Sequence, residues 1–145
     1  MYNGLVHAHS GLRWIVLVLL ILTIINSFAK KKSGVFTEKD RKLGLFTFIF
    51  SHVQLLLGLV LYFISPLVVF SASAMKNTVQ RFYLVEHISL MLVAIILITL
   101  GYSKSKRASS DRKKFGIIGT YFLIALILIL AAIPWPFRIP GAGWF

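Results

Sequence analysis

The stretch FTFIFSHVQLLLGLVLYFISP, residues 46–66, decides the fold class of this chain. It carries no charged side chain, and it is long enough to cross a bilayer as a helix, which takes about 20 mostly apolar residues. His52 and Gln54 lie inside it. Because polar side chains are costly in lipid, a histidine in such a span indicates a candidate functional site.

Three further apolar stretches accompany it, so the sequence predicts spans at about residues 12–28, 43–64, 82–102 and 115–133. Hydrophobic residues make up 58% of the 145-residue chain and mean hydropathy is +0.85, which exceeds what soluble domains show. The connecting segments are short, and Thr37 is a predicted cap for the start of the second helix. We therefore expect one all-α membrane domain, a four-helix bundle with up-down-up-down topology.

The formal net charge of +12 comes from 16 Lys and Arg side chains against 4 Asp and Glu. Six of the bases lie in residues 29–42, six lie in residues 103–114, and four lie elsewhere. Because basic loops stay on the cytoplasmic side of a membrane, we expect both loops inside the cell and both termini outside. This distribution explains the charge without a nucleic-acid partner. The chain has no cysteine, which excludes disulfides, thiolate metal sites and iron–sulfur clusters.

Polar side chains of the second and third spans are predicted to lie near the inside of the bundle. On a helix that turns about 100° per residue, His52 and Gln54 flank a stripe of small residues that suits close helix packing. In the third span a comparable stripe carries Tyr83, and Glu86 and His87 lie on either side of its axis.

The other two histidines precede the first span. His9 and Arg13 share a helix face with the polar residues of that span, whereas His7 lies on the opposite face. We therefore favour His9 over His7 as the residue that points into the bundle. His9 and His87 are at similar depths, whereas His52 lies roughly 10 Å deeper than His87 by the helical rise, so those two pair only if helices tilt.

Haem is the first chemistry that this pattern suggests. A b-type haem needs an apolar slot between helices, one or two imidazoles for its iron, and cations or hydrogen-bonding groups near the surface for its propionates. The candidates are, for the iron, His52, His87 and His9 or His7, and, for the surrounding pocket, Arg13, Gln54, Tyr83 and Glu86.

Three other interpretations remain open. His7 and His9, with a nearby histidine, would chelate copper or zinc if residues 7–9 were extended, since residues two apart on a helix point away from each other. His52, Glu86 and His87 would form a proton relay if they were linked. Each histidine would also serve as an ordinary polar bridge between helices.

Three segments resemble a known family of small four-span bacterial membrane proteins labelled cytochrome b-like. They are HSGLRW at 9–14, SHVQLLLGL at 51–59 and VEHISLMLVA at 85–94, and the resemblance covers nearly the whole chain. The second segment is also similar to haem A synthase, whose four-helix halves hold haem between histidines.

The resemblance implies haem b, iron and electron transport in the bacterial inner membrane. It makes His52 and His87 the leading iron ligands, with His9 third. The chain has one bundle where haem A synthase has two, and no histidine in residues 115–133, which does not favour a haem-modifying activity.

We therefore expect a haem b protein that passes electrons alongside respiratory-chain components, as a partner of other membrane proteins or as a homo-oligomer. The alternative is a cofactor-free accessory or assembly subunit of a membrane complex, in which the polar residues join helices. An enzyme acting alone is not indicated, because the sequence shows no nucleophile–base constellation and no phosphate-binding loop.

Overall fold

The computed structural model describes residues 1–144, and these residues form a bundle of long helices. The long helices are α1 (Tyr2–Lys30), α2 (Glu38–Ile64), α4 (His87–Arg107) and α5 (Asp111–Ala132). Three short elements connect α2 to α4: the 3₁₀ turn η1 (Ala72–Lys76), α3 (Thr78–Arg81) and the π-helical turn η2 (Phe82–Glu86). The last two run without a break into α4, so the third span is one continuous helix from Thr78 to Arg107.

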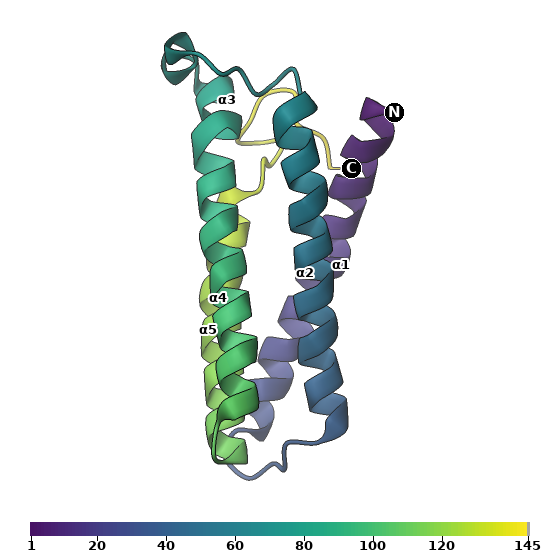
Figure 1. The fold of residues 1–145 in the computed structure, drawn as a ribbon, viewed down its shortest axis with the longest axis vertical. Coiled ribbons are helices and arrows are strands. Elements are labelled where there is room, and N and C mark those ends of the chain that lie inside the picture. Colours follow the sequence, from purple (N-terminus) through teal and green to yellow (C-terminus); the bar gives the residue numbers. More distant parts are fainter. Residues whose placement is uncertain (145) are drawn as a thin grey trace.

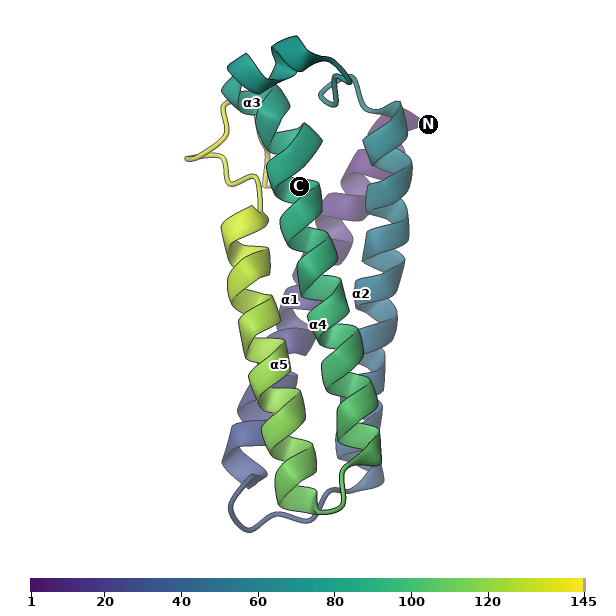
Figure 2. The same cartoon turned by 60° about the vertical axis from the view of Figure 1, so that its left-hand side comes forward.

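The helices run alternately up and down, which confirms the predicted four-helix bundle (Figures 1 and 2). Both termini lie near the end that also carries residues 65–77, which we call the terminal end. The loops at 31–37 and 108–110 lie at the opposite end, which we call the basic end. α1 packs against α2 and α5, and α4 packs against α5, whereas α2 and α4 contact each other less extensively.

All four long helices are long and apolar enough to span a membrane, so this is a multi-pass membrane protein. The bundle core holds large side chains with no exposure, among them Leu20, Ile98 and Phe122. The outer surface is apolar as well, as at Leu56, which is 63% exposed, and Phe63, which is 72% exposed. A surface of this kind suits contact with lipid chains.

The first helix begins much earlier than the predicted start near residue 12. α1 begins at Tyr2, with Leu5 N–H bonded to the Met1 carbonyl, so the histidines at 7 and 9 lie on a continuous helix. The residues before position 12 include glycine but no proline. Glycine only weakens a helix, whereas proline interrupts its hydrogen bonds.

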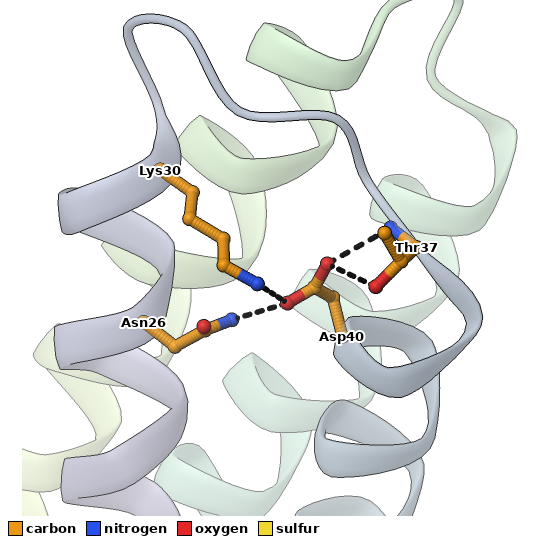
Figure 3. Close-up of polar contacts among 4 residues, drawn as sticks. All are labelled: Asn26, Lys30, Thr37 and Asp40. Atoms are coloured by element: carbon orange, nitrogen blue, oxygen red, sulfur yellow. Dashed lines mark hydrogen bonds and ion pairs between the residues drawn. The ribbon is translucent and has the colours of Figure 1, made fainter.

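A buried carboxylate fixes the turn between α1 and α2 at the basic end (Figure 3). Asp40 accepts hydrogen bonds from Lys30 Nζ and Asn26 Nδ2, each at 2.7 Å. Its other oxygen accepts from the backbone N–H and the hydroxyl of Thr37, each at 2.8 Å. Thr37 is the N-cap of α2, as predicted, and the cluster joins the end of one helix to the start of the next.

Replacement of Asp40 by Ala is expected to destabilise the bundle. The Asp40 side chain is 3% exposed, and its loss leaves one ammonium, one amide and one capped helix end without their acceptor, which costs about 2–3 kcal/mol. Thermal unfolding in detergent measures this as a lower midpoint. Glu38→Ala is the control, because Glu38 is 61% exposed and its ion pair with Arg41 contributes under about 1 kcal/mol. Equal effects of the two changes would contradict the role given to Asp40.

Candidate functional site

A cavity of about 190 Å³ lies between the four long helices towards the terminal end. Along α1 it extends from Tyr2 to Val16, a length of about 21 Å at the helical rise. Most of its lining is aliphatic, as at Leu55, Met91 and Ile95. Polar side chains from each of the first three spans also line it. Five of them are site residues predicted from the sequence: His9, Arg13, Gln54, Tyr83 and His87. Such a slot, apolar with a few polar groups, is typical of ligand sites between helices.

Two imidazoles meet at this cavity. The ring centroids of His9 on α1 and His87 on α4 are 6.4 Å apart, and the ring planes make an angle of 72°. His87 Nδ1 lies 2.7 Å from the carbonyl oxygen of Ala132. Because a carbonyl only accepts, Nδ1 carries the proton and donates it to this bond. Nε2 of His87 then keeps its lone pair, and within residues 1–144 no hydrogen bond uses it.

The carbonyl that holds His87 is free because of the sequence after α5. The N–H groups that would continue the helical ladder to residues 130 and 132 belong to Pro134 and Pro136, which have none. Side chains replace them: Trp135 Nε1 donates to Leu130, Arg138 Nη1 to Ala131 and His87 Nδ1 to Ala132. The prolines therefore create the acceptor that orients the imidazole.

A π-helical turn precedes His87. The turn spans Phe82–Glu86, and the hydroxyl of Tyr62 on α2 donates to the carbonyl oxygen of Leu84 at 2.9 Å. π-turns inside helices are frequent at functional sites, because one extra residue per turn redirects the side chains that follow. Here both Tyr83 and His87 face the cavity.

His9 is accommodated by a glycine on the facing helix. A Cβ atom added to Gly58 would lie 3.0 Å from His9 Cε1, closer than side chains normally approach. Gly58 is one of the small residues in the stripe beside Gln54, which by itself predicts close helix packing, and in the structure it makes room for an imidazole. Gln54 adds a second contact, since its Nε2 donates to the His9 carbonyl at 2.8 Å.

Unsatisfied polar atoms are concentrated at this cavity. Within residues 1–144, three buried side-chain atoms have no hydrogen-bond partner: His9 Nδ1, Arg13 Nε and Gln54 Oε1. All three residues line the cavity. Arg13 also donates through Nη2 to the carbonyl oxygen of Trp144 at 2.6 Å, which brings the C-terminal segment over the site. Buried polar groups are normally paired, so three unpaired ones around one cavity mark it as a candidate site, with ordered water or a bound ligand as the partners that would satisfy them.

His52 does not line this cavity, so the structure does not bring it together with His87. Its Nδ1 lies 2.7 Å from the Phe48 carbonyl oxygen, and its Nε2 lies 3.2 Å from Thr99 Oγ1 on α4. Its ring packs on Phe48, with centroids 4.1 Å apart. One residue of helical rotation separates it from Ser51, which does line the cavity. His52 is thus a polar bridge between α2 and α4.

Two other predicted site residues lie elsewhere. Glu86 pairs with Arg81 at 2.9 Å, is 37% exposed, and does not orient an imidazole. His7 is exposed on α1 and points away from the cavity. Because residues 7–9 are helical, the extended geometry required for copper or zinc chelation is absent, and no cluster of three or more metal-binding side chains occurs in residues 1–144. His52, Glu86 and His87 bond different partners, so they form no relay.

Comparison of the chain with protein-family models, with curated proteins and with solved structures finds no match in any of the three.

A pair of glycine substitutions tests the packing of His9. Gly11 also lies in α1, and a Cβ added there meets nothing within 4 Å. Gly11→Ala is expected to raise the unfolding midpoint, because alanine favours a helix by up to about 1 kcal/mol over glycine. Gly58→Ala is expected to lower it, because the new methyl group displaces the imidazole and overpacking costs about 1–3 kcal/mol. Equal stabilisation by both changes in thermal unfolding would show that His9 does not pack on Gly58.

Proposed function

We propose that this protein binds haem b in the cavity and passes electrons within the membrane, with His9 and His87 as the iron ligands. The observation that carries the proposal is the separation of the two imidazoles. An imidazole nitrogen bonds a transition metal at about 2.0–2.1 Å, and its ring centre lies roughly 1.1 Å further away. The 6.4 Å between the ring centroids of His9 and His87 would therefore leave room for one iron held by a nitrogen of each ring.

The orientation of the rings is compatible with this assignment. Two rings that share one axis through a metal can adopt any angle between their planes, so an angle of 72° is allowed. The bond from His87 Nδ1 to the Ala132 carbonyl has the form that metal-binding histidines use, in which a second acceptor fixes the ring and makes the ligating nitrogen more basic.

The remaining lining residues have roles that suit haem. When bound, haem supplies a reversible one-electron couple. The aliphatic lining excludes water and lowers the local dielectric constant, which is one of the factors that set a redox potential. Tyr83 lies nearer the terminal end than His87 and offers a hydroxyl to a propionate group, and Arg13, one helical turn deeper than His9, offers a cation. Electron donors and acceptors would be membrane-protein partners or further copies of the chain.

Histidine substitutions test the haem ligands. Purified protein, produced with haem supplied during expression, is expected to give a sharp α-band in a dithionite-reduced minus oxidised spectrum. His9→Ala and His87→Ala are each expected to abolish or shift this band, because each removes an axial ligand. His52→Ala and His7→Ala are the matched controls and are expected to leave it unchanged, since neither residue faces the cavity.

Two outcomes of this experiment would contradict the proposal. A band that is lost in His52→Ala but retained in His9→Ala would show that the iron binds at another site. A colourless wild-type protein with no porphyrin would favour the cofactor-free accessory subunit. In that case the polar residues of the cavity would serve only to join helices.

We further propose that the protein lies in a bacterial inner membrane with its basic end in the cytoplasm. The support is charge: the segments 29–42 and 103–114 carry twelve of the sixteen Lys and Arg residues, and both lie at the basic end. The cavity then opens towards the periplasmic half of the bilayer.

Cysteine labelling tests this orientation, and the natural chain has no cysteine to interfere. Ser33 in the 31–37 loop and Ser73 in η1 are both exposed, and these two segments lie at opposite ends of the bundle (Figure 1). In intact spheroplasts, a membrane-impermeant maleimide is expected to label Ser73→Cys at once and Ser33→Cys only after the membrane is permeabilised. The reverse pattern would invert the proposed topology.

A further inference from the structure

A second cavity, of about 280 Å³, lies at the basic end, remote from the histidine pair. It is formed where the 31–37 loop and the start of α2 meet the end of α4 and the start of α5. Three basic side chains line it, Arg41, Lys106 and Lys114, and they come from three different helices. The only carboxylate among its lining residues is Glu38. Three cations against one anion leave the cavity with an excess of two positive charges.

Carboxylates do not neutralise the two lysines. Arg41 pairs with Glu38, which uses the one acidic group of the cavity. Lys114 Nζ is 4.0 Å from Asp111, at the limit for an ion pair, and no carboxylate within residues 1–144 pairs with Lys106. Aromatic rings hold both ammonium groups instead.

The ring contacts fix where the two charges lie. Lys106 Nζ lies 5.7 Å from the centre of the Tyr102 ring, and Lys114 Nζ lies 5.5 Å from that of Phe36. Both rings line the cavity. A cation over an aromatic face is positioned without losing its charge, so both lysines keep their attraction for an anion.

We propose that this cavity binds the phosphate of an anionic phospholipid headgroup. A headgroup is favoured because the cavity lies at the ends of the membrane-spanning helices, where they reach the headgroup region. Phe46 on α2 is 50% exposed and lies five residues beyond Arg41, about 7–8 Å deeper into the bilayer. A phosphate held at the cavity would therefore have its acyl chains along an apolar surface, as in other basic pockets between membrane helices.

The proposal differs from the general effect of basic loops on topology. Topology depends on the number of bases near the membrane, whereas this site depends on their convergence. Lys32 and Lys39 belong to the same basic end and are exposed, but they do not line the cavity. They provide a matched control with the same change of charge.

Detergent-purified full-length protein tests the proposal by titration with dioleoyl phosphatidylglycerol or dioleoyl phosphatidylcholine in mixed micelles, with the unfolding midpoint as readout. Phosphatidylglycerol is expected to stabilise the wild type and phosphatidylcholine to have little effect. Lys106→Gln with Lys114→Gln is expected to weaken the apparent affinity for phosphatidylglycerol roughly thirtyfold, since each lysine near an anionic headgroup contributes about fivefold. Lys32→Gln with Lys39→Gln is expected to retain it.

Further arms make the test decisive. Lys106→Arg with Lys114→Arg keeps both charges and is expected to retain the lipid effect, so a loss in the Gln variant reflects charge and not misfolding. An equal loss in the Lys32 and Lys39 control would overturn the proposal in favour of a diffuse surface charge. Inorganic phosphate that stabilises the wild type as much as phosphatidylglycerol would overturn the assignment to a lipid.

Discussion

The hydrogen bond from His87 Nδ1 to the Ala132 carbonyl oxygen is the interaction on which the candidate site depends. Inside a membrane, no water is present to hydrogen-bond a free backbone carbonyl. A proline follows α5 and leaves the Ala132 carbonyl without a helical partner, so this carbonyl needs a hydrogen-bond donor from another part of the chain. His87 is that donor, and the bond determines both its tautomer and its direction. An imidazole held this way presents Nε2 as an acceptor or as a metal ligand, which is the property that the proposed function uses.

The cavity also carries a cost that a purely structural bundle would avoid. His9 Nδ1, Arg13 Nε and Gln54 Oε1 are buried without partners, and each such group destabilises a protein by about 1–3 kcal/mol when nothing compensates. The hydroxyl groups of Thr23 and Thr47, deeper in the bundle, do have partners. They bond each other at 2.8 Å, and each also donates to or shares a bond with a backbone carbonyl. Among the buried side-chain polar atoms of residues 1–144, only His9 Nδ1, Arg13 Nε and Gln54 Oε1 lack a partner, and all three belong to residues that line the cavity.

The bundle was predictable from sequence because lipid allows few alternatives to helices with satisfied backbones. Uncharged stretches fixed the spans, and Thr37 marked the start of α2. The side chains that face the cavity were harder to predict, because a rotation of 100° separates a residue that faces it from its neighbour: Ser51 lines it and His52 does not. The preference for His9 over His7 agrees with the structure, but the role of Gly58 and of the Ala132 carbonyl depends on packing between helices distant in sequence.

The two ends of the bundle thus differ in chemistry: a cavity between two imidazoles lies towards the terminal end, and a cavity lined by three basic side chains lies at the basic end. The proposed function requires that His9 and His87 hold one iron between them. An anomalous difference map, measured at the iron absorption edge on crystals of the haem-supplemented protein, tests this most directly. One iron peak is expected between the rings of His9 and His87. A map with no such peak, and with both rings bonded to neighbouring side chains, would contradict it.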